Sequence, residues 1–317
     1  MVAVVTRRLA AAIGTLFLIS VTTFLLANLR SAQDIARGVL GREVAPEQLQ
    51  AFVKLHGLDR PVWARYWSWL TGALHGNLGV SIASGRSVAG EIGRPLVLTL
   101  ILACVAFAIA VPLSVLLGQF LARHWASPVD LTVSSALAVI AAIPEFVLGI
   151  VLVLVFSVTL HWLPIDSAGL SFGGPIDEIK VFVLPVATLV LSSVAYLARV
   201  TRATVRETLA APHTRTAVLR GLPRNVVVWD HVLRSAASPI VSASGLTFLY
   251  LIGGVIVVEN VFSFLGLGTL LVNSIQQGDV IVVEAAAMLL GVVVVVTGLI
   301  TDMLGVYFNP RLREGAR

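Results

Sequence analysis

The feature of this sequence that most limits its fold is a series of long apolar runs separated by polar segments. Hydrophobic residues make up 57% of the 317 residues, and charged residues only 12%. Soluble globular domains carry about 25% charged residues. A helix of about 20 apolar residues is long enough to cross the hydrocarbon core of a bilayer. The sequence therefore predicts an all-α integral membrane protein.

Six of these runs are predicted to be transmembrane helices. Arg7 and Arg8 precede the first run, which is too long for the core of a typical cleaved signal peptide, so an uncleaved first span is favoured over a signal peptide. The third run contains Pro144, which is expected to kink its helix. The six runs cover approximately residues 9–29, 96–121, 131–160, 181–197, 239–258 and 280–308.

The distribution of basic residues predicts the side of the membrane on which each segment lies. Seven arginines fall between Arg199 and Arg234, whereas the short outer loops contain only Lys180. Cytoplasmic loops carry an excess of Lys and Arg. Both termini are therefore expected in the cytoplasm, with a large extracytoplasmic loop between the first and second spans. Despite the net charge of +5, this pattern fits membrane topology better than a nucleic-acid-binding face.

The basic loop between the fourth and fifth spans has prolines and a glycine that predict a short helix. Pro212 ends the helix that continues out of the fourth span, and residues 213–220 can make about two helical turns. Gly221 stands where a helix end favours a left-handed residue, and Pro223 prevents continuation. Such a helix, held between two helix-breaking positions, would transmit force to the fourth and fifth spans together.

Several segments resemble the peptide-type permeases of bacterial ABC importers, specifically the first of the two paired permeases. Residues 215–222 read Arg-Thr-Ala-Val-Leu-Arg-Gly-Leu, which is similar to the R-T-A-x-x-K-G-L of the cytoplasmic "EAA" loop in that subfamily. Arg215 stands where the wider motif has glutamate. The resemblance covers nearly the whole chain, because it continues through residues 55–61, 75–81 and 259–268 and the terminal Asn309-Pro310-Arg311.

The resemblance implies the pore-forming permease subunit of an ATP-driven importer that moves dipeptides or oligopeptides across the bacterial plasma membrane. Implied partners are a second homologous permease, two cytoplasmic ATP-binding subunits, an extracytoplasmic solute-binding protein and membrane lipid, but no nucleic acid. The implied regions are residues 1–30 (amino terminus and first span), 31–95 (extracytoplasmic loop) and 96–317 (core permease domain), with an ATPase-coupling loop at 201–236.

Two alternatives to peptide import stay open. A permease of the same type could carry nickel or another small solute. A self-sufficient secondary transporter is the other alternative, although the sequence shows no repeated pair of Gly- or Pro-broken spans and only one clear carboxylate in mid-bilayer. An intramembrane enzyme is disfavoured because no catalytic or metal-ligating set of residues stands out.

The resemblance also implies that the coupling loop docks in a groove of the ATPase. The simpler interpretation, a basic inner loop that follows the charge rule, explains the arginines but not the proline and glycine positions. The chain has no Gly-x-x-x-x-Gly-Lys-Ser/Thr motif, so it is not expected to be an enzyme, and ATP and Mg²⁺ are expected on partner subunits. The implied docking residues are Arg215, Thr216, Ala217, Arg220, Gly221 and Leu222.

Three polar residues of the apolar runs are candidates for the translocation pathway. Glu145 is expected near the middle of the third span, where a carboxylate costs about 2.5–3.5 kcal/mol on insertion scales and should face protein or a wet cavity. It either meets the amine of a passing peptide, or it is structural, paired with backbone or hydroxyl groups at the kink or simply protonated. Glu259 and Asn260, near the outer end of the fifth span, either take part in a gate or the binding-protein contact, or are water-facing helix ends.

Asp302 and the small residues of the spans are expected to have structural roles. Asp302 is expected to be structural, with Arg199 or Arg202 as a conceivable partner. Small residues suit close helix contact in lipid; the glycines concerned are Gly245, Gly253, Gly254, Gly291 and Gly298.

Overall fold

The computed structural model describes residues 2–29, 31–41, 43–165, 175–223, 226–227 and 232–308. Within these ranges the chain consists of helices and turns, with one isolated bridge between Val80 and Ser87. The all-helical prediction is confirmed. In the described part of the chain, five single helices are long and apolar enough to cross a membrane: α1 (Val2–Ala27), α5 (Val88–Arg123), α8 (Pro175–Ala210), α11 (Leu233–Val261) and α13 (Val280–Phe308).

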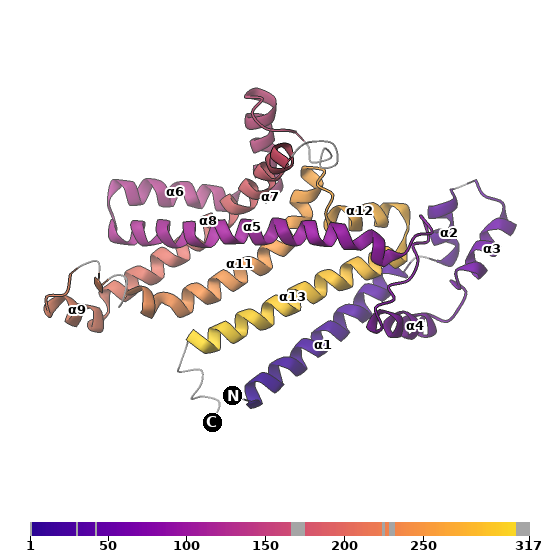
Figure 1. Cartoon of the computed structure of the whole chain (residues 1–317), viewed down its shortest axis with the longest axis horizontal. Coiled ribbons are helices and arrows are strands. Elements are labelled where there is room, and N and C mark those ends of the chain that lie inside the picture. Colours follow the sequence, from indigo (N-terminus) through magenta and orange to yellow (C-terminus); the bar gives the residue numbers. More distant parts are fainter. Residues whose placement is uncertain are drawn as a thin grey trace. The chain divides into compact units, whose positions relative to one another are not determined.

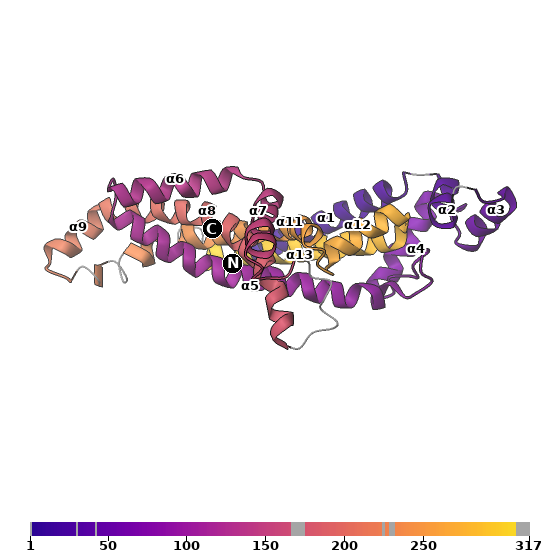
Figure 2. The ribbon, with the colours of Figure 1, turned by 90° about the horizontal axis from the view of Figure 1, so that it is seen from above.

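The remaining candidate span is broken rather than kinked. It consists of α6 (Pro128–Ala142), α7 (Glu145–Leu152) and η1 (Val153–Thr159), a π-helix that continues α7. The two parts are bent by 106° at the break, which Figures 1 and 2 show from two directions. Ile143 is extended, because the residue before a proline is disfavoured in the helical region. The predicted single helix is therefore two helices, and Glu145 begins the second.

The chain divides into two compact units. One contains residues 101–264 and 297–317 with the first five residues, and is called the α8–α11 unit here. The other contains residues 6–100 and 265–296, and is called the α2–α4 unit. In the α8–α11 unit, α8 packs against α6, α7 and α11, and α9 (Pro212–Leu219) follows α8 along the chain.

Small residues allow helices of the α8–α11 unit to approach one another closely. A Cβ atom added at Gly118 of α5 would lie 2.6 Å from the carbonyl oxygen of Ala198 on α8. A Cβ atom at Gly245 of α11 would overlap the side chain of Thr301 on α13. The predicted role in close contact is thus confirmed for Gly245, whereas Gly253 faces open space.

The α2–α4 unit carries the short helices of the segment between the first and second spans. These are α2 (Ala32–Leu40), α3 (Pro46–Leu55) and α4 (Val62–Leu74), and α12 (Leu267–Gln277) contacts α2. Ile35, Leu58, Ile82 and Val280 form a buried apolar cluster in this unit. The segment is therefore folded around a buried core that it shares with the start of α13, and it is not an irregular loop.

A buried carboxylate fastens the loop before α5 to the start of α13. Asp279 accepts hydrogen bonds from the hydroxyl of Ser81 and from the backbone N–H groups of Ile82 (3.4 Å), Ala83 (3.3 Å) and Val282 (3.3 Å). A carboxylate at a helix amino terminus satisfies N–H groups that have no partner within the helix. Asp279 therefore positions the segment that precedes α5.

Candidate functional site

The short helix predicted after Pro212 is present as α9. Pro212 occupies its first turn, where the missing N–H of proline costs no hydrogen bond. Gly221 has φ of +79° and donates its N–H to the carbonyl of Val218 at 2.9 Å. The predicted helix and the left-handed glycine after it are both confirmed.

One face of α9 is anchored in the α8–α11 unit. The hydroxyl of Thr214 donates to the carbonyl oxygen of Thr208 on α8 at 2.7 Å. Ala217 is only 6% exposed and belongs to a buried apolar cluster with Val205 of α8 and Ala236 of α11. A displacement of α9 would therefore disturb the packing of both long helices, because it shares their core.

The opposite side of α9 is exposed and partly apolar. Leu219 is 87% exposed, and Val218 beside it is also exposed. We define the docking face as the exposed residues of this segment: Thr216, Val218, Leu219, Arg220 and Leu222.

The structure separates the residues that the sequence grouped together for docking. Thr216, Arg220, Gly221 and Leu222 are exposed, whereas Ala217 faces the core; the side chain of Arg215 lies outside the described residues, as do residues 309–311. Sequence reasoning missed Val218 and Leu219, two of the three exposed apolar residues of the docking face, and named only Leu222. Helical periodicity was the available signal, because positions 214 and 217 share one face and position 219 lies across from them.

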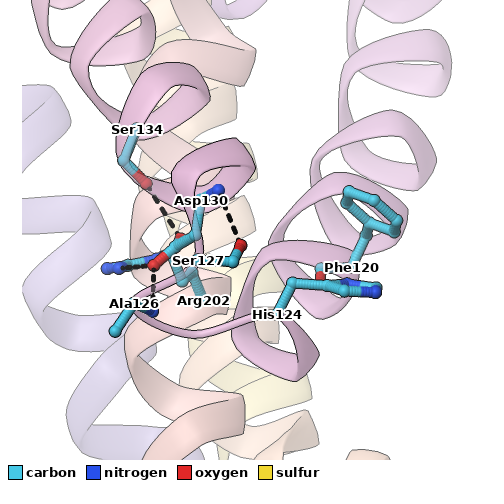
Figure 3. Close-up of polar contacts among 7 residues, drawn as sticks. All are labelled: Phe120, His124, Ala126, Ser127, Asp130, Ser134 and Arg202. Carbon is cyan, nitrogen blue, oxygen red and sulfur yellow. Dashed lines mark hydrogen bonds and ion pairs between the residues drawn. The ribbon is translucent and has the colours of Figure 1, made fainter.

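A buried ion pair connects the first turn of α6 to α8 (Figure 3). Asp130 is fully buried and binds Arg202 through two hydrogen bonds, from Nε to Oδ1 at 2.6 Å and from Nη2 to Oδ2 at 2.7 Å. The backbone N–H of Ala126 (3.0 Å) and the hydroxyl of Ser134 (3.3 Å) also donate to the Asp130 carboxylate. This bidentate, fully hydrogen-bonded geometry is what a buried carboxylate requires.

The aromatic ring of Trp125, in the turn between α5 and α6, strengthens the connection. The guanidinium carbons of Arg202 and Arg206 lie 4.1 Å and 3.1 Å from the centroid of the Trp125 ring. We call Trp125, Asp130, Arg202 and Arg206 the Asp130 cluster. Arg202, considered from the sequence as a partner of Asp302, thus forms its ion pair with Asp130. α8 runs from this cluster directly toward α9 (Figure 1).

Glu145 lies among hydroxyl groups from two other helices. The hydroxyl of Ser192 on α8 donates to Oε1 of Glu145 at 3.1 Å, and Tyr250 on α11 also hydrogen-bonds the carboxylate. A Cβ atom added at Gly254 of α11 would overlap this carboxylate. The glycine therefore provides the space that Glu145 occupies.

A cavity of about 400 Å³ lies beside these hydroxyl groups. Ser192 and Tyr250 line it together with Ser193, Tyr196 and Thr247. The hydroxyl of Ser193 is buried and has no hydrogen-bond partner among the described residues. The cavity thus presents several hydroxyl groups next to one carboxylate, an arrangement suited to binding an ammonium or amide group.

The other two candidate pathway residues do not line this cavity. Glu259 is fully buried in α11, so a water-facing helix end does not describe it. Asn260 is exposed, and its side-chain amide donates to the carbonyl oxygen of Ile256 at 2.7 Å. The structure therefore does not group them with Glu145.

Comparison with known proteins identifies the class of protein. Residues 110–314 match the family model for the binding-protein-dependent transport system inner membrane component, and residues 1–93 match the model for the amino-terminal part of such membrane components. The chain belongs to this family. It is a multi-pass protein of the bacterial plasma membrane and the permease component of an ABC importer, rather than an enzyme itself.

Named relatives match along nearly their whole length. A glutathione transport system permease protein of Escherichia coli O6:H1 is 36% identical over 311 residues, which is 98% of each chain. The protein of the same name in Escherichia coli K12 is 35% identical over the same length. A Brucella abortus protein, whose name describes the permease of a peptide transport system, is 33% identical over 313 residues, or 99% of each chain.

Proposed function

We propose that this permease forms half of the pathway through which an ATP-driven importer moves short peptides into the cell. The names of its relatives refer to glutathione and to peptides, and both kinds of solute have a peptide backbone with charged ends. These names favour peptides over nickel as the cargo. A carboxylate beside a cavity lined by hydroxyl groups also suits a peptide ammonium group.

The proposal includes an orientation and a set of partners. Both termini and α9 lie in the cytoplasm, and residues 31–95 lie outside, in keeping with the arginine distribution. A second homologous permease completes the pathway, a solute-binding protein delivers the peptide, and two ATP-binding subunits dock on the cytoplasmic side. A binding-protein-dependent family implies the delivery step.

The two faces of α9 are the single observation that carries the coupling proposal. Thr214 and Ala217 hold one face in a core shared with α8 and α11, while Leu219 on the other face is 87% exposed. An ATPase that binds the docking face can thus act on the long helices. ATP binding shifts the permease toward one conformation only if the closed, ATP-bound ATPase binds that conformation more tightly than the alternative conformation.

Reconstitution of the complete importer tests the proposed function. Proteoliposomes that contain both permeases and the ATP-binding subunits are expected to accumulate a labelled short peptide only when ATP and the binding protein are supplied. Leaving out the ATP-binding subunits provides the control. Peptide uptake that continues without them, driven by an ion gradient, would instead establish a secondary transporter.

A pathway role for Glu145 predicts a specific change in transport kinetics. Glu145→Gln removes the charge that would meet a peptide ammonium group, so the KM for uptake is expected to rise about tenfold, the loss typical of a charge-assisted hydrogen bond. Gly254→Ala should have a similar effect, because its methyl group displaces the carboxylate. Uptake of labelled peptide as a function of concentration measures the change.

A neighbouring glycine supplies the control for this test. A Cβ atom at Gly253 meets nothing within 4 Å, so Gly253→Ala should leave KM within about twofold of the unmodified protein. If Glu145→Gln transports every peptide with unchanged kinetics, Glu145 has no part in the pathway.

A further inference from the structure

The α2–α4 unit contains a cavity of about 450 Å³ that the proposed transport mechanism does not use. Its walls come from α1, from the segment between the end of α3 and the end of α4, from the turn at residues 77–79 and from the start of α13. Small-molecule sites in proteins typically occupy about 300–1,000 Å³. The cavity therefore has room for a ligand such as a dipeptide or tripeptide.

A polar relay forms one wall of this cavity. The guanidinium of Arg65 donates to Oδ1 of Asn28, and Nδ2 of Asn28 donates to Oε1 of Glu284 at 2.5 Å. Burial lowers the pKa of Arg65, and the carboxylate of Glu284 acts in the opposite direction. The guanidinium stays charged at neutral pH because arginine does not lose its proton in proteins. Arg65 is thus a fixed cation whose orientation Asn28 holds.

Two further hydrogen-bond donors lie in the wall, one buried and one exposed. Nε1 of Trp69 is buried and has no hydrogen-bond partner among the described residues. Asn77 is exposed, and its Oδ1 accepts from the N–H of Gly79 at 3.0 Å, so its NH₂ group can donate to a ligand at the pocket mouth. Buried donors nearly always have partners in native structures. The buried indole N–H of Trp69 therefore indicates a ligand that supplies a hydrogen-bond acceptor.

The rim of the cavity is basic. Lys54 and Arg60 are exposed and line it together with His56. Among the described residues that line the pocket, three are cations (Lys54, Arg60 and Arg65) and one is a carboxylate, Glu284. Phe24 and Ile281 provide apolar wall beside these groups. The combination suits a small molecule with an anionic end and an apolar or neutral remainder.

We propose that this cavity, the α3–α4 pocket, binds the carboxylate end of a short peptide. Arg65, the indole N–H of Trp69 and the amide of Asn77 supply the donors, while Lys54 and Arg60 attract the anion. This inference rests on the proposed import of peptides and adds a binding site in the permease itself. A peptide held there would be retained close to the membrane after release from its binding protein.

Equilibrium binding to the full-length permease in lipid nanodiscs, without any partner protein, tests the α3–α4 pocket. The probes are the dipeptide Ala-Ala and its carboxy-terminal amide, which differ only in the anionic end. Ala-Ala is expected to bind at least about tenfold more tightly than the amide, because charge-assisted hydrogen bonds to a carboxylate are lost in the amide. The dissociation constants are measured by equilibrium dialysis with labelled probe.

Matched double variants locate the binding site. Lys54→Gln with Arg60→Gln removes two exposed cations at the rim and should weaken Ala-Ala binding about tenfold or more. Arg86→Gln with Arg94→Gln removes the same charge from exposed positions in the same unit that do not line the pocket, and should leave binding unchanged. The exposed positions of all four residues make a folding defect an improbable source of any difference.

The outcomes separate this inference from the proposed function. Equal binding of the dipeptide and its amide, no binding of either, or equal loss in both double variants would overturn the α3–α4 pocket. Transport by the complete importer would continue to support the proposed function in each of these cases. Conversely, a failure of ATP-dependent uptake with intact, carboxylate-selective binding would count against the importer and leave the binding site established.

Discussion

Leu219→Asp is expected to abolish co-purification of the ATP-binding subunits while the permease remains folded in the membrane. Leu219 ends α9 with 87% of its surface exposed and no role in the core, so the substitution should not affect folding. At the centre of a protein interface, loss of an apolar anchor costs about 2–4 kcal/mol, which is at least a thirtyfold loss of affinity. A buried, unpaired carboxylate adds to that cost. Affinity purification followed by quantification of the subunits measures the result.

Leu74→Asp is the matched control for this prediction. Leu74 is 76% exposed at the end of α4, in the α2–α4 unit, so the chemical change and the exposure are similar. This variant should retain the ATP-binding subunits and transport peptide normally. If Leu219→Asp also retains them, the docking face does not bind the ATPase and the coupling role of α9 must be abandoned.

Features that depend on local chemistry could be predicted from the sequence. α13 has the bounds of the sixth predicted span, because an uninterrupted apolar run needs only its own backbone hydrogen bonds to form a helix. α9 lies between Pro212 and Gly221 as expected, because proline and glycine act on backbone conformation directly. In both cases residues close together in the sequence determine where the helix begins and ends.

Features that depend on distant residues could not be predicted. Asp130 and Arg202 are 72 positions apart, and Ser81 and Asp279 are 198 apart, so no periodic pattern links either pair. The exposure of Leu219 depends on how α9 packs against α8 and α11. Pro144 signalled a bend, but the 106° break also depends on the packing of α7 against α8 and α11.

The Asp130 cluster suggests how the docking face and the spans are linked. Arg202 and Arg206 lie on α8, shortly before the helix reaches Thr208, whose carbonyl oxygen holds α9. Trp125 belongs to the α5–α6 turn, and Asp130 to the first turn of α6. The cluster therefore makes α8 and the α5–α6 turn a single mechanical element, so that motion of α9 moves both.

Arg202→Gln is expected to destabilise the α8–α11 unit by about 3–5 kcal/mol, because it leaves the buried carboxylate of Asp130 without its cation. Adding Asp130→Asn to this variant should restore part of the loss, since the pair then carries no unmatched charge. Thermal unfolding of the purified permease in detergent measures both effects. ATP hydrolysis by the assembled importer should continue while peptide uptake falls, because α9 would no longer move the α5–α6 turn.

An exposed ion pair provides the comparison for this effect. Arg37 and Asp34 on α2 are 3.7 Å apart, with 50% and 56% of their side chains exposed. Surface pairs of this kind contribute about 0–1 kcal/mol, so Arg37→Gln should scarcely change the unfolding temperature. The difference between the two variants follows from burial, because each loses one arginine charge. If Arg202→Gln and Arg37→Gln unfold at the same temperature, the Asp130 cluster does not hold the α5–α6 turn against α8, and force from α9 must reach the spans by another route.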